Sequence, residues 1–165
     1  IAFDRDGIGV SGGTIVPGQL EHRGNDSEKI TMKFETPSIA ATITVSRLIA
    51  SENEVGQVEA FLNNESVGLW TFTTANGVPL LNGEPIDFTL ANGKLTTDAN
   101  GSAGNGTFTL PEGVLFDTLV FTGTEYANNK TNPVDSSDYY IQSVSVKEIP
   151  DTEFEYTATD EAGNT

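Results

Sequence analysis

Hydrophobic and polar residues alternate with a period of two along most of this chain, which is the pattern of β-strands that bury one face. The clearest alternation is Tyr-Tyr-Ile-Gln-Ser-Val-Ser-Val at 139–146, where we expect Tyr139, Ile141 and Ser143 to share one face and the residues between them to share the other. Further strands are predicted at 30–34, 39–45, 57–62, 65–70, 107–110 and 115–121. Strands rather than helices are therefore expected to build the molecule.

Turn-forming residues separate these strands. Asn63-Asn64 lies between two of them, and asparagine tolerates the positive φ that a two-residue hairpin requires. The stretch 74–105 is rich in Gly, Asn, Asp and Thr and is expected to hold one or two irregular strands, including 86–90. No window has an apolar stripe with helical spacing, and the helical turn that we expect lies near 46–53. Short strands with such turns predict an all-β fold, an antiparallel β-sandwich of the jelly-roll type.

The composition limits the partners of the chain. Its 165 residues suit one domain, and 24 Asp and Glu against 8 Lys and Arg give a formal net charge of -16. This charge argues against nucleic acid and anionic membrane surfaces as partners, because both would repel it. It favours cations, cationic partners or neutral ligands, and the alternative is that it only keeps a secreted protein soluble. No apolar run is long enough to span a membrane, so no membrane insertion is expected.

The acidic residues gather with Asn, Ser and Gly in three predicted loops, at 4–7, 98–102 and 128–138. Calcium takes about 6–8 oxygen ligands from carboxylates, side-chain amides and backbone carbonyls. Bound metal also stabilises a folded chain that has no Cys and hence no disulfides. We therefore expect a calcium-stabilised fold with the candidate ligands Asp4, Asp6, Asp98, Asn100, Asn128, Asp135 and Asp138. In each loop the alternative is an ordinary turn with solvated acids.

Asp4 and Asp6 precede a glycine, Gly7, and alternate acids on a turn can place two carboxylates on one ion. The first half of an EF-hand loop has this form, but its twelfth position is Ile15 here instead of Glu, so the segment is not an EF-hand. In many jelly-roll binding modules a structural calcium joins the first strand to the last. By that analogy Asp138 is a candidate partner of this segment.

The loop 128–138 is also the best candidate for binding a ligand. It combines amides, hydroxyls and carboxylates with neighbouring aromatic side chains. A calcium ion with open positions can bind sugar hydroxyls or a peptide carboxylate directly. The candidate ligand-binding residues are Tyr126, Asn128, Asn129, Asp135, Ser137 and Tyr139. A well-capped turn is the alternative.

Other candidates have simpler interpretations. Glu52, Glu54 and Glu59 are possible calcium ligands, but acids near a strand end more often protect an exposed edge. Trp70 is expected in the core rather than as a platform for sugar, and His22 is expected as a lone surface histidine. A Ser-His-Asp triad would need that histidine, and no Gly-x-Ser-x-Gly motif accompanies it. No phosphate loop or dinucleotide fingerprint occurs either, so the chain is not expected to be an enzyme.

Four sets of segments carry a family resemblance. They are Asp-Arg-Asp-Gly-Ile-Gly-Val-Ser-Gly-Gly at 4–13, Val-Pro-Gly-Gln-Leu at 16–20 with Ser-Glu-Lys-Ile at 27–30, Ser-Arg-Leu-Ile-Ala-Ser-Glu-Asn-Glu at 46–54 with Gly-Gln-Val-Glu-Ala-Phe at 56–61, and Phe-Asp-Thr-Leu-Val-Phe at 116–121 with Asp-Ser-Ser-Asp-Tyr-Tyr-Ile at 135–141. Together they resemble the ligand-binding region near the distal end of giant RTX adhesins of Gram-negative bacteria. The resemblance implies an extracellular, calcium-dependent β-sandwich at the cell surface that binds a peptide or carbohydrate on another cell, as in biofilm formation.

The pattern changes after Pro150. An aromatic-x-Tyr-Thr strand at 154–157 followed by Thr-Asp-x-x-Gly-Asn-Thr at 159–165 resembles the start of an immunoglobulin- or cadherin-like repeat of large bacterial surface proteins. We therefore interpret 1–149 as the binding β-sandwich and 150–165 as a linker and the truncated start of a following repeat. The expected function is calcium-dependent cell adhesion by a monomeric module within a long multidomain chain. The alternative is a structural spacer of the adhesin in which calcium provides only rigidity.

Overall fold

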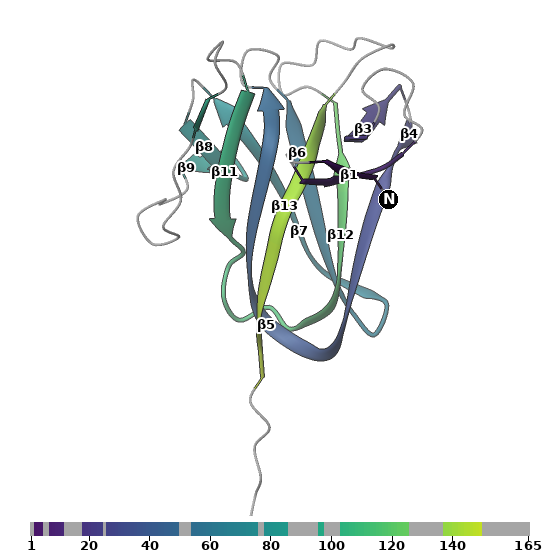
Figure 1. Cartoon of the computed structure of the whole chain (residues 1–165). Helices are drawn as coiled ribbons and strands as arrows, with labels where there is room; N and C mark the ends of the chain where they lie inside the picture. Colours follow the sequence, from purple (N-terminus) through teal and green to yellow (C-terminus); the bar gives the residue numbers. More distant parts are fainter. Residues whose placement is uncertain are drawn as a thin grey trace, which may run out of the picture.

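The fold is built from antiparallel β-strands. The computed structural model describes residues 2–4, 7–11, 18–24, 26–49, 54–75, 78–85, 96–97, 103–125 and 137–149, and none of these residues lies in a helix. The strands are β1 (Ala2–Asp4), β2 (Gly7–Gly9), β3 (Leu20–Arg23), β4 (Asp26–Ser27), β5 (Lys29–Ile49), β6 (Val55–Leu62), β7 (Glu65–Ala75), β8 (Val78–Leu81), β9 (Glu84–Pro85), β10 (Thr96–Thr97), β11 (Ala103–Thr109), β12 (Phe116–Gly123) and β13 (Asp138–Glu148) (Figure 1). The predicted all-β class is confirmed, and the arrangement is consistent with a β-sandwich.

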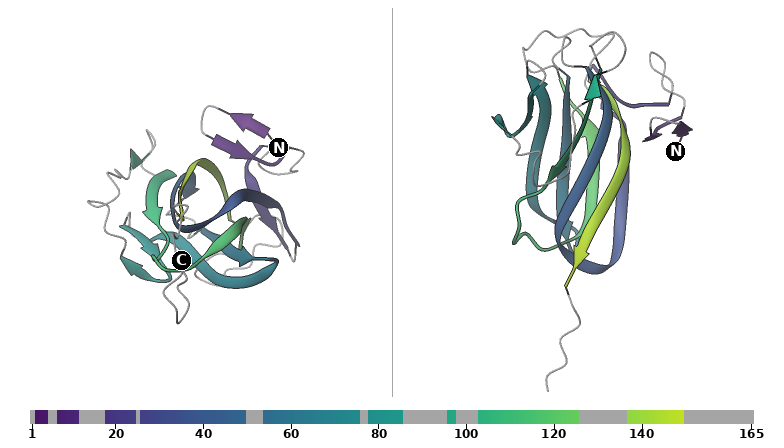
Figure 2. Two further views of the ribbon diagram at one scale, coloured as in Figure 1. Left: turned by 90° about the horizontal axis from the view of Figure 1, so that it is seen from below. Right: turned by 60° about the vertical axis from the view of Figure 1, so that its left-hand side comes forward.

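The long strand β5 belongs to both layers of the fold. Its first half pairs with β12, from Lys29 opposite Thr122 to Ser38 opposite Phe116. Its second half pairs with β13 on one side and β11 on the other. One layer therefore runs β5-β12-β6-β7-β8-β9, and the other runs β11-β5-β13-β2-β1. Figure 2 shows β5 curving from one layer into the other.

A change in side-chain alternation accompanies this change of layer. Ile30 is buried and Phe34 packs against the core in the first half of β5, so even-numbered positions face inward there. In the second half the buried residues Ile43 and Val45 occupy odd-numbered positions. Because side chains alternate strictly along a regular strand, the shift shows that β5 turns its inward face between these segments.

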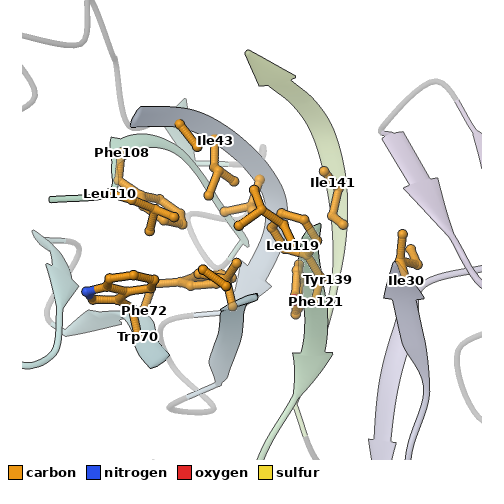
Figure 3. Close-up of a cluster of buried hydrophobic side chains, with 14 of the residues drawn as sticks. Ile30, Ile43, Trp70, Phe72, Phe108, Leu110, Leu119, Phe121, Tyr139 and Ile141 are labelled. Carbon is orange, nitrogen blue, oxygen red and sulfur yellow. The ribbon is translucent and has the colours of Figure 1, made fainter. Parts of the chain in front are cut away.

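Aromatic side chains fill the centre between the layers (Figure 3). The ring centroid of Phe72 lies 4.7 Å from that of Phe108 and 5.3 Å from that of Tyr139, the second contact being edge-on. These contacts join β7, β11 and β13 in one core. Trp70 is 8% exposed and belongs to the same cluster, which confirms its predicted place in the core.

The strand β13 departs from the predicted alternation. Tyr139 and Ile141 are completely buried, as expected for one face, but Ser143 is exposed. Farther along, Val144 and Val146 pack against the core. The prediction that 139, 141 and 143 share a face was therefore wrong, because the register with β5 shifts between Ile141 and Ser143. A β-bulge of this kind adds a residue and reverses the facing of all later side chains.

Two local predictions have clear outcomes. The hairpin between β6 and β7 is confirmed, with Asn63 and Asn64 at φ 52° and 67° in its turn. Asp117 supports this turn, since its Oδ2 accepts a hydrogen bond of 2.7 Å from the Asn63 main-chain nitrogen. The helical turn near 46–53 was wrong for 46–49, which continue β5 and pair with β11 and β13. Residues 50–53 and the predicted strand 86–90 lie outside the described residues.

Candidate functional site

Four chain segments meet at one end of the molecule, near β3 and β4 (Figure 1). The His22 main-chain nitrogen donates to the Ser137 carbonyl at 3.0 Å, and the Ser137 nitrogen donates to the Thr124 carbonyl at 3.3 Å. The Thr124 nitrogen donates to the Val55 carbonyl at 3.0 Å, and the Val55 nitrogen donates to Ser137 Oγ at 2.7 Å. We call this set of contacts the strand junction. It ties β3 and the starts of β6 and β13 to the residues after β12.

Three carboxylate side chains are buried at the strand junction. The exposed fractions of Glu54, Asp138 and Glu21 are 0%, 4% and 5%. Oε1 of Glu54 accepts a hydrogen bond of 3.2 Å from the main-chain nitrogen of Asp138. Glu21 lies directly opposite Asp138 in the pairing of β3 with β13. Burial of a carboxylate is costly unless hydrogen bonds or cations compensate it, so this group requires an explanation.

The pairing also shows on which face two of these carboxylates lie. Leu20 and Tyr139 are opposite each other, and both are completely buried members of the hydrophobic core. Side chains alternate along each strand, and directly opposed residues share a face. Glu21 and Asp138 therefore leave the strands on the face that turns away from the core. Their burial means that other parts of the chain cover this face.

A fourth carboxylate, Glu28, lies beside Glu21. The Glu21 nitrogen donates to Glu28 Oε2 at 3.0 Å, and the Glu28 nitrogen donates to the Glu21 carbonyl at 3.0 Å. Partial burial raises the pKa of Glu28 above its ordinary value, and the negative charges of Glu21 and Asp26 add to that rise. The hydrogen bond from Glu21 opposes the rise but is outweighed. The field on this face is therefore negative.

Two buried side-chain oxygens on this part of the chain have no hydrogen-bond partner. They are Oε1 of Glu21 and Oε1 of Gln19, and the exposed fraction of Gln19 is 8%. Nearly all buried polar groups in folded proteins are hydrogen-bonded, so each exception calls for a missing partner such as a water or an ion. The two residues flank the core residue Leu20: Glu21 lies on the outer face of β3, and Gln19 belongs to the bend that immediately precedes this strand.

Among the described residues, no three Asp, Glu or His side chains form a group that could hold a metal ion. A cation at the strand junction would therefore need ligands of other kinds. Side-chain amide and main-chain carbonyl oxygens are also calcium ligands, in addition to carboxylates, and Gln19 offers such an amide oxygen. The chemistry available is thus the binding of a hard cation by mixed oxygen ligands.

The structure describes three of the predicted site side chains, and all three are buried at the strand junction. Asp138 supplies the main-chain nitrogen for Glu54, and Ser137 Oγ accepts from Val55. Tyr139 is completely buried, and its hydroxyl donates to the Thr122 carbonyl at 2.9 Å. In this arrangement Ser137 and Tyr139 hold strands together and do not face solvent.

The other predicted residues are not placed. The main chain of Asp4 forms part of β1, but its side chain is outside the described residues. The remaining ones also lie outside: Asp6, Asp98, Asn100, Tyr126, Asn128, Asn129 and Asp135. The expected closeness of the first and last strands is present in the main chain, since Ile8 of β2 pairs with Ile141 of β13. The hydrogen bond from Ser137 to Thr124 also brings together the two ends of the segment that contains Asn128 and Asp135.

His22 is half-buried rather than a surface residue, which corrects the prediction. The Ser27 hydroxyl donates its proton to the Gly123 carbonyl at 2.9 Å. The contact between Ser27 Oγ and His22 Nδ1 therefore requires a proton on Nδ1, which donates to the hydroxyl oxygen. Nε2 is buried and has no hydrogen-bond partner. The pair fixes β3 and β4 against the end of β12, and Ser27 is not oriented for attack on a substrate.

Sequence reasoning missed Gln19, Glu21 and Glu28 as site residues. Gln19 and Glu21 lie on either side of an apolar residue, and Glu28 lies in the polar run 25–29, so the three do not form one continuous metal-binding loop in the sequence. The signal that was present is the alternation around Leu20, which places a glutamine and a glutamate on one face. Only the pairing of β3 with β4 and β13 brings that face next to other acids.

No protein-family model, no curated protein and no solved structure matches this chain. In the part of the chain that the structure describes, no helix is long and apolar enough to cross a membrane.

Proposed function

We propose that this protein is a calcium-dependent adhesion module of a large bacterial surface protein, which binds a peptide or a glycan on another cell. The observation that carries the proposal is the buried Glu21 carboxylate, whose Oε1 has no hydrogen-bond partner, at the end of the molecule where Glu54 and Asp138 are also buried. Buried carboxylates repel one another unless cations offset their charge, and calcium is the common extracellular cation with a preference for such oxygens. If an ion and an ionic or hydroxylated ligand bind at the same end of the molecule, binding of the ligand depends on binding of the ion.

Several further observations support a binding module of the adhesin type. The segments that resemble the ligand-binding region of RTX adhesins include 46–54 and 135–141, and their described parts meet at the strand junction. The antiparallel strands and the pairing of β2 with β13 agree with a calcium-stabilised jelly roll, in which the first strand lies near the last. The acidity agrees with an extracellular module on the cell surface.

A structural spacer of the same adhesin is the second candidate. Ser137 and Tyr139, two of the residues expected to touch a ligand, are buried and engaged in contacts between strands. Ions that only stiffen the strand junction would give the same buried carboxylates. In that case the module would position a neighbouring binding domain and would capture nothing itself.

Binding rather than catalysis is also favoured by the chemistry of the histidine. The proton of the Ser27 hydroxyl is directed to the Gly123 carbonyl, so His22 does not act as a base toward it. This supports a role without a Ser-His nucleophile. Hydrolysis of an oligosaccharide by the purified chain would contradict a purely adhesive role.

Peptide and glycan arrays test the proposal directly. The labelled chain is applied to both arrays in millimolar calcium and in EDTA. An adhesion module gives spots that appear with calcium and disappear with EDTA. A chain that binds calcium but gives no spot on either array is a spacer, and a ligand retained equally in EDTA contradicts calcium dependence.

A further inference from the structure

We infer that the outer face of β3 holds one divalent cation of the calcium type, with Glu21 and Gln19 as ligands and Glu28 beside them. This inference rests on the calcium dependence of the proposed function, but it does not depend on what the module binds. It adds a defined position for one ion, in a segment that lacks the spacing of a calcium loop.

Two acceptor oxygens without partners are the first argument. Glu21 is 5% exposed and Gln19 is 8% exposed, and Oε1 of each is buried without a hydrogen bond. An ionised carboxylate has only acceptors, and the amide oxygen of glutamine is also an acceptor. The two unsatisfied acceptors differ in chemical type and belong to the residues immediately before and after Leu20. They need hydrogen-bond donors or a cation. Because Gln19 is uncharged, its unsatisfied oxygen is an observation separate from the crowding of Glu21, Glu28 and Asp138.

The charge distribution is the second argument. The Glu28 carboxylate reaches the Glu21 main-chain nitrogen, so two carboxylates are held close together. Asp138 of β13, the strand that pairs with β3, lies directly opposite Glu21. Glu21, Glu28 and Asp138 thus bring like charges together in a partly desolvated place, where mutual repulsion is poorly screened. A cation between these groups offsets the repulsion and satisfies the free oxygens at the same time.

The ligand types indicate which cation fits. Carboxylate and amide oxygens are hard ligands, and a mixed set that includes water suits the flexible coordination of calcium better than the strict octahedron of magnesium. Since no three acidic or histidine side chains converge among the described residues, the ion has few charged ligands. We therefore expect a dissociation constant of roughly 10⁻⁴–10⁻³ M, the range of calcium sites in extracellular modules.

The position of the ion gives it a structural consequence. Within the described part of the chain, β3 pairs with β13 through Leu20 and Glu21 alone, and β4 pairs with β3 alone. An ion held by Gln19 and Glu21, with Glu28 beside it, would join the two residues that flank Leu20. The end of the molecule with the strand junction would then be ordered by calcium.

Calcium titration of variants tests the site. Calorimetric titration and thermal melting of the whole chain are compared for wild type, Glu21→Gln, Gln19→Met and the control Glu112→Gln. Glu112 is exposed in the segment between β11 and β12. We expect both site variants to lose one equivalent of bound calcium or to bind it at least about tenfold more weakly, since a direct ligand should matter no less than an outer-shell partner. Glu112→Gln should keep the wild-type stoichiometry.

The melting curves in EDTA provide the second readout. Without the ion, Glu21→Gln and Gln19→Met should melt at or above the temperature of wild type, because Gln19→Met removes an unsatisfied buried acceptor and Glu21→Gln removes a buried negative charge. Unchanged calcium stoichiometry and affinity in both variants would overturn the site and would indicate that water satisfies these oxygens. The variants can lose calcium as expected while the chain gives no spots on the peptide and glycan arrays. That result would support the ion at Glu21 and Gln19 and would reject the adhesive function.

Discussion

Glu54 and Asp138 are 84 positions apart in the sequence, yet the Asp138 main-chain nitrogen donates a hydrogen bond to the Glu54 carboxylate. Glu54 immediately precedes β6, and Asp138 begins β13, so the bond joins strands that lie in different layers. Both residues are almost completely buried. A hydrogen bond to a charged acceptor is stronger than one between neutral groups, and burial raises its importance further. Glu54 thus acts as a clamp between the layers.

Replacement of this clamp should be costly. Glu54→Ala removes the acceptor and leaves the buried Asp138 nitrogen without it, for which we expect a loss of about 1–3 kcal/mol in the free energy of unfolding. Urea denaturation followed by tryptophan fluorescence measures the loss. Glu112→Ala is the matched control, since this exposed glutamate should change stability by no more than about 0.5 kcal/mol. Equal effects of the two substitutions would contradict the role of Glu54.

Tyr139→Phe separates a structural tyrosine from a ligand-binding one. The substitution removes the hydroxyl that donates to the Thr122 carbonyl and keeps the edge-on contact with Phe72. We expect the free energy of unfolding to fall by about 1 kcal/mol, the usual net value of one hydrogen bond. Capture of a ligand found on the arrays should not change. A loss of capture without a loss of stability would show that Tyr139 reaches the ligand.

The same tyrosine predicts the behaviour of the protein at alkaline pH. Complete burial raises the pKa of Tyr139 well above its ordinary value of 10.0, because the phenolate is poorly solvated in the core. The unfolded chain therefore loses this proton first as the pH rises, and the contribution of the neutral phenol is present below pH 10 and declines above it. Melting temperatures measured between pH 8 and pH 11.5 should fall at the upper end. Tyr139→Phe should fall less steeply, and parallel curves would refute this cause.

Much of the fold follows from local pattern, and the exceptions have identifiable causes. The Asn63-Asn64 hairpin is encoded by two adjacent residues that accept positive φ. The bulge after Ile141 is not visible in the sequence, because it depends on how β13 meets β5. The turn expected at 46–49 failed for a similar reason, since pairing with β11 and β13 keeps these residues in β5.

The candidate site was harder to predict than the fold. Asp138 was identified from its loop, but its burial arises from contacts with Glu54 and Glu21, which are distant in the sequence. Tyr139 follows the same acidic loop, yet the alternation of the strand turns it into the core. The composition predicts that cations bind, whereas the pairing of strands decides which oxygens come together.

A small-to-large substitution tests the packing of the core. A Cβ atom added to Gly56 would lie 2.2 Å from Cε2 of Phe72, the residue directly opposite it on β7. Phe72 is held in turn by Phe108 and Tyr139, so it has little room to move. Gly56→Ala should destabilise the chain by about 1–3 kcal/mol, the usual cost of overpacking. Denaturation in urea measures this cost.

Phe72→Leu provides the rescue that identifies the cause. Combined with Gly56→Ala it shortens the ring that the new methyl group meets. The double variant should therefore lose less than the sum of the single losses. Additive losses would show that the glycine is needed for its main-chain conformation instead of for space.

Removal of calcium should lower the stability of the whole chain. An ion with a dissociation constant of roughly 10⁻⁴ M is present at about 100 times that constant in about 10 mM calcium, where it contributes about 2.7 kcal/mol that is lost in EDTA. For a domain of this size each such ion raises the melting temperature by about 5–10 °C. The buried carboxylates of Glu21, Glu54 and Asp138 make the loss larger, because their repulsion is no longer offset when the ions leave. Scanning calorimetry in millimolar calcium and in EDTA gives the difference.

Two controls separate ion binding from general screening of the net charge of -16. Sodium chloride at 0.5 M screens exposed charges and should restore only part of the melting temperature that EDTA removes. Magnesium at the concentration used for calcium should also restore less, because mixed oxygen ligands with flexible geometry favour calcium. If the melting curve is the same with calcium and with EDTA, the buried carboxylates are accommodated without metal. The calcium dependence of the proposed function and the ion on β3 would then both be rejected.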